Sequence, residues 1–265
     1  MAEVPGQPRP DRSRGVFETL LVLDGNPVDL DAHLARLRAS LAALYPDRDA
    51  PPVDVPSLRG PYGRPRDGTS VVEAGAMRVT VAPEADGSLE AQVAVREVEP
   101  KLVFDPPPVA LGSFTLRGGL GEHKWADRSL LDTAQAELGY DQLPVIVDED
   151  GAVLEAARAN LFAVREQVLA TPPLDGRILP GITRARVLEI AAALGIETQE
   201  RELGIDDLRT ADEILLTGSV RGVERVRALD GAPPASGGGV GARIAAELRS
   251  AAQPGGSLKK SLLTR

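Results

Sequence analysis

Residues 118–128 read GGLGEHKWADR and place Lys124 between a glycine-rich turn and the start of a predicted helix. The stretch also holds the one tryptophan of the chain, Trp125, and one of its two histidines, His123. Glycines let a backbone come close to a ligand, and a lysine amine can form an imine with an aldehyde. The alternative is a solvated surface lysine, and on these residues alone both interpretations stay open. Lysine is scarce in this chain, and its other positions are Lys101, Lys259 and Lys260.

Two later turns carry small and hydroxyl-bearing residues. Residues 179–184 read LPGITR and precede a helix that we expect to start at about Thr183 and to end at Gly195. A helix start offers free N–H groups and the positive end of the helix dipole, which suit a phosphate monoester. The alternative, which the local residues favour, is that Thr183 only caps the helix. Residues 217–220, TGSV, form a similar turn after a predicted strand, and its alternative is a simple β-turn.

Two charged residues lie among apolar neighbours. Glu155 follows an apolar run in VLEAARANLF, residues 153–162, and a buried carboxylate needs a partner. A protonated pyridine nitrogen would serve, and so would a salt bridge to Arg158 or another of the abundant arginines. Arg36 borders the apolar stripe of an early helix, where its guanidinium could bind phosphate in a cleft or lie on the surface.

Composition excludes several classes of function. A net charge of -9 argues against a nucleic-acid partner, which needs many basic contacts. No apolar run is long enough to cross a membrane, and residues 1–6 lack the layout of a signal peptide. The absence of cysteine removes disulfides, thiolate nucleophiles and sulfur metal ligands, and two histidines leave little for a metal site. We therefore expect a cytoplasmic protein with no metal.

Strand and helix patterns alternate along the chain and indicate an α+β protein of two domains. Asp31 is expected to cap the first helix, whose leucines recur at helical spacing. The predicted strands cover residues 15–23, 76–81, 90–98, 143–147, 152–155, 161–164, 168–170 and 213–216. The other predicted helices cover residues 127–138, the segment from Thr183 to Leu194, and a last segment after the connector 235–241.

Proline-rich and glycine-rich stretches suggest the domain boundaries. Three consecutive prolines from Pro106 fit neither helix nor sheet interiors and indicate a linker. A further Pro/Arg/Asp-rich connector covers residues 46–69. The expected organisation is a disordered lead-in (1–14), a small N-terminal α+β domain (15–104), a linker (105–117), a larger C-terminal α+β domain (118–251) and a flexible tail (252–265).

The order of these motifs resembles the class IV aminotransferases, the fold-type IV pyridoxal-phosphate enzymes. That family includes branched-chain and D-amino-acid aminotransferases and aminodeoxychorismate lyase. The resemblance runs from Gly15 to about Gly231, beginning with GVFET at residues 15–19 and passing through HLARL at residues 33–37. It implies the two-domain α+β fold, pyridoxal 5'-phosphate as cofactor, and a homodimer in which a partner loop completes each site.

The resemblance also implies a role for each matching residue. Lys124 is similar to the catalytic lysine that carries the cofactor as a Schiff base, and Glu155 to the partner of the pyridine nitrogen. Asn160 matches the asparagine of the turn after that glutamate, with a mostly structural role. The remaining expected cofactor contacts, on the phosphate side, are Arg36, Gly181, Ile182, Thr183, Ser219 and Val220. The substrate side is expected to include Phe17 and Arg221.

Residues 217–223, TGSVRGV, are similar to the Thr-Asn-Ser-Leu-Arg-Gly-Val pattern of aminodeoxychorismate lyases, with Gly218 in place of asparagine. This resemblance implies a lyase of folate biosynthesis that splits an amino-bearing carboxylate, 4-amino-4-deoxychorismate, into pyruvate and 4-aminobenzoate. The alternative is an aminotransferase that passes the amino group of a branched-chain or D-amino acid to a 2-oxo acid. The chain departs from the family at Val81-Ala82-Pro83, where Thr-Arg-Gly is frequent.

Overall fold

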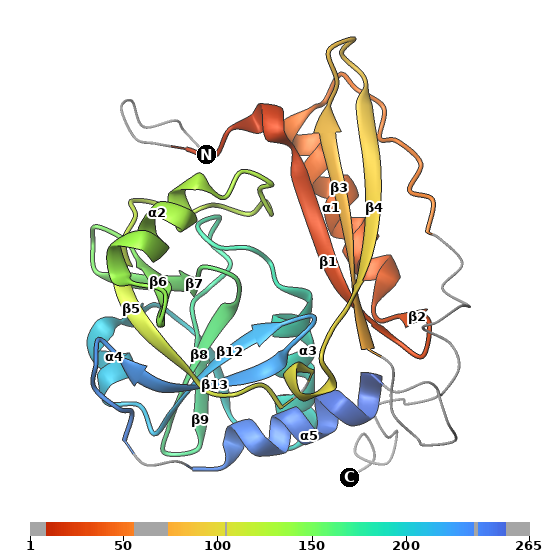
Figure 1. Ribbon diagram of the computed structural model, residues 1–265. Helices are drawn as coiled ribbons and strands as arrows, with labels where there is room; N and C mark the ends of the chain where they lie inside the picture. Colours follow the sequence, from red (N-terminus) through yellow and green to blue (C-terminus); the bar gives the residue numbers. More distant parts are fainter. Residues whose placement is uncertain (1–8, 56–73, 104, 236–237, 253–265) are drawn as a thin grey trace.

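The computed structural model describes residues 9–55, 74–103, 105–235 and 238–252. Within these residues the strands form a four-stranded sheet and a nine-stranded sheet (Figure 1). The predicted α+β class is confirmed. No helix in the described parts of the chain has the length and apolar character needed to cross a membrane.

The first sheet is antiparallel, in the order β2-β1-β3-β4. Its strands are β1 (Val16–Leu23), β2 (Asn26–Pro27), β3 (Ala74–Pro83) and β4 (Leu89–Glu97). Helix α1 (Leu30–Leu44) lies beside β1 and β3 in Figure 1 and buries Leu37, Leu41 and Leu44. The predicted strands at 15–23, 76–81 and 90–98 are confirmed here.

Strand β1 is buried on both faces, because its alternate side chains enter two different cores. Leu20 and Val22 pack with the leucines of α1. Leu21 and Leu23 pack instead with Phe162 and the buried face of α3. Since side chains alternate across a strand, one strand therefore joins the two halves of the molecule.

The second sheet has the order β10-β9-β8-β12-β13-β5-β6-β7-β11, with parallel pairs at β9/β10, β13/β5 and β5/β6. Its strands are β5 (Val109–Thr115), β6 (Gln142–Val147), β7 (Ala152–Ala156), β8 (Asn160–Arg165), β9 (Val168–Thr171), β10 (Thr198–Glu200), β11 (Leu203–Gly204), β12 (Glu213–Gly218) and β13 (Gly222–Leu229). The remaining helices are α2 (Ser129–Leu138), α3 (Ile182–Ala193), α4 (Ile205–Arg209) and α5 (Val240–Ala252), with short 3-10 turns η1 (Arg12–Arg14) and η3 (Pro100–Leu102).

The expected linker, 105–117, is wrong over most of its length. Val109–Thr115 forms β5, an interior strand of the nine-stranded sheet between β13 and β6. The prolines end at Pro108, and Ala110 and Leu111, which follow them, are buried inside the sheet. The wider division of the chain into domains stays a prediction.

The start of α1 also differs from expectation. Asp29, not Asp31, occupies the N-cap position, with a left-handed backbone (φ 52°) and no side-chain cap bond. Its carboxylate instead accepts a hydrogen bond from Arg186 on α3 at 2.6 Å. Asp31 lies in the first helical turn, where a negative charge favours the helix dipole.

The expected disordered lead-in is partly wrong. Residues 12–14 form η1, and the backbone N–H of Asp11 donates to Asp127 at 2.8 Å. Residues 1–8, 56–69 of the expected connector and 253–265 of the expected tail lie outside the described residues. Strands β10, β11 and β13 and helix α4 were not predicted. β10 is exposed throughout, so it carries no apolar pattern to reveal it.

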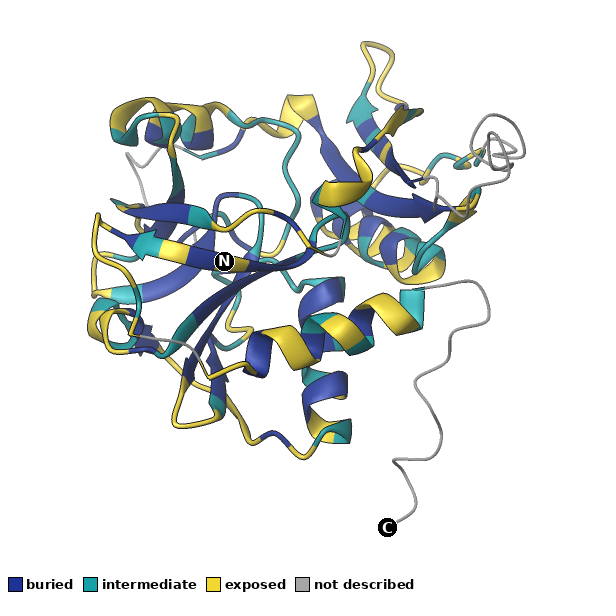
Figure 2. Cartoon of the chain, turned by 60° about the horizontal axis from the view of Figure 1, so that its bottom comes forward, coloured by how far each residue is buried: buried dark blue, intermediate teal, exposed yellow. Residues whose placement is uncertain are grey.

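The helices that cover the second sheet follow their apolar patterns. The predicted segments at 127–138 and from Thr183 are confirmed as α2 and α3, and the last helix as α5. In Figure 2, α5 is exposed on one side and buried on the other. Its buried Val240, Ile244 and Leu248 recur every four residues and pack into the core around Phe162.

Phe162, fully buried in β8 at the centre of this core, tests the packing. Replacing it with alanine removes the ring and leaves a cavity, so we expect Phe162→Ala to lower the free energy of unfolding by about 3–5 kcal/mol. Urea denaturation measures this loss. Leu174→Ala, at a position 48% exposed, is the control and should change it by less than about 0.5 kcal/mol.

Candidate active site

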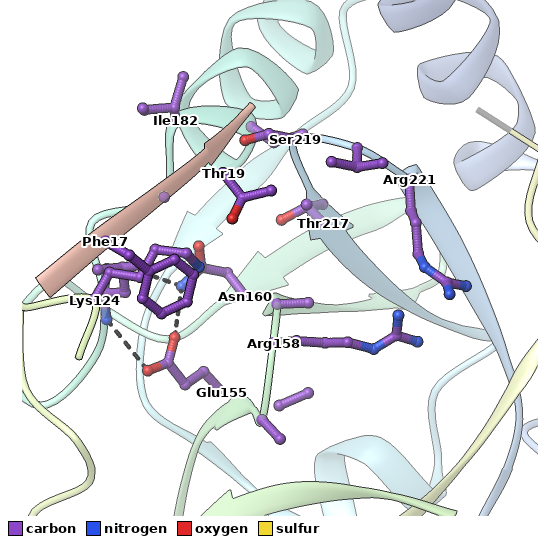
Figure 3. A pocket seen from close by; sticks show the side chains of 18 of the residues that line it. Phe17, Thr19, Lys124, Glu155, Arg158, Asn160, Ile182, Thr217, Ser219 and Arg221 are labelled. Atoms are coloured by element: carbon purple, nitrogen blue, oxygen red, sulfur yellow. Dashed lines mark hydrogen bonds between the residues drawn. The ribbon is translucent and has the colours of Figure 1, made fainter. Parts of the chain in front are cut away.

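A cavity of about 390 Å³ lies where the first sheet faces the second, and every site residue predicted from the sequence lines it. Figure 3 shows the labelled members reaching it from β1, from the β7–β8 turn, from the start of α3 and from the β12–β13 turn. The predicted members are Phe17, Arg36, Lys124, Glu155, Asn160, Gly181, Ile182, Thr183, Ser219, Val220 and Arg221. Their individual roles stay predictions.

Lys124 is held beside β1 by backbone hydrogen bonds. The N–H of Phe17 donates to the Lys124 carbonyl at 2.8 Å, and the N–H of Ala126 donates to the Gly15 carbonyl at 3.0 Å. Its Nζ lies 5.0 Å from the centre of the Phe17 ring and, among the described residues, makes no hydrogen bond or ion pair. Burial, assisted by the positive charge of Arg36, lowers the pKa of Lys124 to about 8.

The glycine-rich turn before Lys124 is fixed in place. Gly119 has a φ of +60°, and a side chain there would overlap the Arg177 carbonyl, so the position requires glycine. The N–H of Gly121 donates to that carbonyl at 3.2 Å, and the Trp125 indole donates to the Leu120 carbonyl at 2.9 Å. The turn therefore presents Lys124 from a rigid support.

Glu155 is a buried carboxylate without an ion-pair partner among the described residues. It is 7% exposed and accepts hydrogen bonds from the Asn160 amide at 3.2 Å and, more weakly, from the Leu179 N–H at 3.4 Å. Burial raises the pKa of Glu155 to about 8. The alternative of a salt bridge to Arg158 is wrong, because Arg158 pairs with Glu224 at 3.0 Å.

Asn160 links Glu155 to the start of α3. Its amide also donates to the Leu179 carbonyl at 2.9 Å, and its Oδ1 packs directly against the Cα of Gly181. A methyl group at Gly181 would overlap this oxygen. The asparagine therefore sets the position of the turn that precedes α3.

Arg36 is oriented by a buried carboxylate that sequence reasoning missed. Its Nε and Nη2 donate to the two oxygens of Glu18 at 2.7 and 2.6 Å, and its Nη1 donates to the Pro180 carbonyl at 2.9 Å. Glu18, 1% exposed, also contacts His33 at 2.8 Å. Burial raises the pKa of Glu18, but the hydrogen bonds with His33 and Arg36 outweigh it and hold that pKa below its usual value. The sequence did carry a signal for Glu18, because a charged residue within a largely apolar strand indicates a buried charge that needs a partner.

Two hydroxyl-bearing turns meet at the other wall of the cavity. Gly181, not Thr183, is the N-cap of α3, so Ile182 and Thr183 belong to its first turn, where N–H groups lack helical partners. The Oγ1 of Thr183 lies 3.4 Å from the Oγ of Ser219. The buried Oγ1 of Thr217 has no hydrogen-bond partner among the residues that the structure describes, which is costly unless a ligand supplies one. These donors fit a phosphate monoester.

The cavity is also rich in arginine, and most of these residues carried no role in the sequence analysis. The Arg78 guanidinium lies 3.8 Å from the centre of the Phe17 ring. Arg128 donates to the Ala157 carbonyl at 2.5 Å, and burial lowers its pKa. Arg96 and Arg158 also line the cavity. These arginines are far apart in the sequence, and only the tertiary fold brings them together. Because they make the lining of the cavity positively charged, the cavity suits an anionic ligand.

The family model for class IV amino-transferases matches residues 15–56 and 121–229, and the chain belongs to this family. Among curated relatives, the branched-chain-amino-acid aminotransferase of Escherichia coli (strain K12) is 39% identical over 103 residues. That alignment covers 39% of this chain and 33% of the relative, so the chain spans about a third of the relative's length. A probable branched-chain-amino-acid aminotransferase of Synechocystis is 36% identical over 118 residues, which cover 44% of this chain and 38% of the relative.

Solved structures of the same fold cover nearly the whole chain. A hypothetical aminotransferase from Mycobacterium tuberculosis, in its PLP-bound form, matches with a TM-score of 0.74 and 27% identity, covering 94% of both chains. A putative 4-amino-4-deoxychorismate lyase from Legionella pneumophila matches with a TM-score of 0.71, covering 93% of this chain and 95% of that one. At 22% identity the second likeness shows the fold alone.

The contact between Gly181 and Asn160 yields a first test of the site. We expect Gly181→Ala to lower the free energy of unfolding by about 1–3 kcal/mol, because the new methyl group overlaps Asn160. Gly204→Ala is the matched control, since Gly204 also begins a helix and a methyl group there would lie 3.8 Å from the Asp207 carboxylate, in ordinary contact. If Gly181→Ala remains as destabilising when Asn160 is also replaced by alanine, the overlap is not the cause.

The pKa of Glu155 yields a second test. Its value rises from 4.5 to about 8 on folding, so between these pH values the folded protein binds one more proton than the unfolded chain. The unfolding free energy of the ligand-free protein therefore falls as pH rises, by about 1.4 kcal/mol per pH unit from this group. Glu155→Gln abolishes the contribution.

Urea denaturation from pH 5 to pH 8 measures the difference between the variant and the wild type. We expect the advantage of Glu155→Gln to grow with pH across this window and to level off above about pH 8. Glu90→Gln, at an exposed position of β4, is the control, and its unfolding free energy should differ from that of the wild type by the same amount at each pH. A pH-independent difference for Glu155→Gln would contradict the raised pKa.

Proposed function

We propose that this chain is a pyridoxal-phosphate lyase that splits 4-amino-4-deoxychorismate into pyruvate and 4-aminobenzoate. One observation carries the cofactor part of the proposal, which the lyase shares with other enzymes of the family. The amine of Lys124 has a pKa of about 8 and no polar partner among the described residues, and it lines the same cavity as the buried Glu155. Lysine is the side chain that binds an aldehyde cofactor through an imine.

The surrounding residues fit the cofactor at its charged ends. Ile182, Thr183 and Ser219 offer N–H groups and hydroxyls to the phosphate, and the Thr217 hydroxyl has no other partner in the described part of the chain. The further expected contacts are Arg36, Asn160, Gly181 and the backbone of Val220. When bound, pyridoxal phosphate supplies an electron sink for the carbon bearing the substrate nitrogen.

Glu155 is suited to form an ion pair with the protonated nitrogen of the pyridine ring. A buried carboxylate with a pKa of about 8 holds its proton at neutral pH unless a cation lies beside it. A protonated ring nitrogen is such a cation, and pairing would offset part of the cost of burying the charge. Asn160 orients the carboxylate for this contact.

Lys124 then has the properties of a general base. With a pKa of about 8, an appreciable part of its amine is unprotonated near neutral pH. It can take the proton from the substrate carbon that bears the nitrogen and return a proton later. Loss of the enolpyruvyl group makes the substrate ring aromatic, and a proton converts the released enolpyruvate to pyruvate.

The choice of lyase is supported by the similarity of residues 217–223 to the lyase pattern and by the charge of the cavity. The substrate carries two carboxylates, and the guanidinium groups of Arg78, Arg96, Arg158 and Arg221 line the cavity. Phe17, whose ring centre lies 5.0 Å from the Lys124 Nζ, adds an apolar side chain to the lining of the cavity. We expect cytoplasmic localisation and a homodimer, and both stay predictions.

An aminotransferase is the second candidate, because the curated relatives quoted above are branched-chain-amino-acid aminotransferases. It would use the same lysine and cofactor. The reaction differs in that the amino group passes to a 2-oxo acid, so turnover requires such an acceptor.

A pyruvate-release assay separates the two. We expect the purified protein with pyridoxal phosphate to release pyruvate from 4-amino-4-deoxychorismate with no 2-oxo acid present. Lys124→Ala should abolish both this release and the absorbance band of the lysine-bound cofactor, because no other lysine among the described residues lines the cavity. Turnover that appears only with an added 2-oxo acid and an amino acid would instead support the aminotransferase.

A further inference from the structure

A buried carboxylate joins two arginines at one end of the cavity. Glu224, on β13, is 3% exposed and lines the cavity. Its Oε1 accepts a hydrogen bond from Arg158 at 3.0 Å and another from Arg221 at 3.1 Å. One oxygen atom is therefore shared by guanidinium groups from two different turns.

The two turns lie side by side. Arg158 belongs to the β7–β8 turn and Arg221 to the β12–β13 turn, and β8 pairs with β12 so that Thr217 lies opposite Asn160. A Cβ added to Gly218 would lie 3.9 Å from the Arg158 carbonyl, in ordinary contact. The backbones thus bring the arginines close together, where they would repel each other without Glu224.

The cluster formed by Arg158, Arg221 and Glu224 can still bind an anion after this pairing. Two guanidinium groups and one carboxylate carry a net charge of +1. The Arg158 and Arg221 side chains are 33% and 32% exposed, and within the described residues neither has another hydrogen-bond partner. In Figure 3 both guanidinium groups lie on the side of the pocket away from Lys124. Unused N–H donors in this arrangement match the two oxygens of a carboxylate.

We propose that Arg158 and Arg221 bind the ring carboxylate of the substrate and that Glu224 is the positioning residue that holds them. In 4-aminobenzoate and its precursor this carboxylate lies at the opposite end of the ring from the amine. With the amine at Lys124, the carboxylate points to the far side of the cavity. The inference rests on the proposed function, which supplies a ring of this kind.

An experiment can distinguish whether Glu224 positions the two arginines or acts on a bound anion only through its negative charge. If the carboxylate acted only through its charge, removing it would strengthen anion binding, because like charges repel. If it positions the arginines, removing it lets them move apart and weakens anion binding. The two alternatives predict opposite signs for Glu224→Gln.

The test compares 4-aminobenzoate with 4-aminobenzamide, its neutral analogue, by calorimetric titration of the pyridoxal-phosphate-loaded protein. We expect the wild type to prefer the acid by about tenfold or more, as charge-assisted hydrogen bonds do. Arg158→Ala, Arg221→Ala and Glu224→Gln should each remove most of this preference. Arg225→Ala, exposed on the same strand, is the matched control and should keep it.

Glu224→Asp keeps the charge and should restore part of the preference, and an unchanged cofactor absorbance shows that each variant retains its pocket. Equal binding of acid and amide by the wild type would overturn the subsite. Tighter binding of the acid by Glu224→Gln would overturn the positioning role.

These outcomes are distinct from failure of the proposed function. A wild type that prefers the acid but releases no pyruvate would count against the lyase and leave the carboxylate subsite standing. Pyruvate release without any preference for the acid would count against the subsite alone.

Discussion

The pairing of β1 with the Lys124 segment is the contact on which the site depends. Two backbone hydrogen bonds join residues 15–17 to residues 124–126. The same strand sends Leu20 and Val22 into the core under α1 and Leu21 and Leu23 into the core around Phe162. The lysine is therefore fixed at the junction of the two sheets by packing on both sides of β1.

Burial determines the chemistry of the cavity. Removal from water lowers the pKa of Lys124 and raises that of Glu155, so both charged forms are disfavoured at the same place. Three of the arginines are also held by buried glutamates: Glu18 holds Arg36, and Glu224 holds Arg158 and Arg221. In each case a carboxylate offsets part of the positive charge and leaves donors that can face a ligand.

The errors of the sequence analysis have a common origin. Three prolines indicated a linker, yet β5 begins directly after them and lies inside a sheet. Asp31 was expected at the N-cap, but α1 begins two residues earlier and Asp29 takes that position, with its carboxylate bonded to Arg186 of a distant helix. Arg158 was a possible partner of Glu155 because the two are close in sequence, but in the fold Arg158 forms its ion pair with Glu224. Each outcome depends on a partner far away in the chain.

The sequence by itself determined the motifs. Each motif is a local pattern that can be recognised from the residues next to it in the sequence. The motifs are Lys124 after a glycine-rich turn, Glu155 within an apolar run, and the turns at residues 179–184 and 217–220. Only the tertiary structure decided that they share one cavity, that Glu18 and Glu224 orient the arginines, and that the Thr217 hydroxyl has no partner among the described residues. The local sequence can indicate that a charged residue is buried, but it does not show which distant segment will supply its partner, and that pairing sets which charges meet.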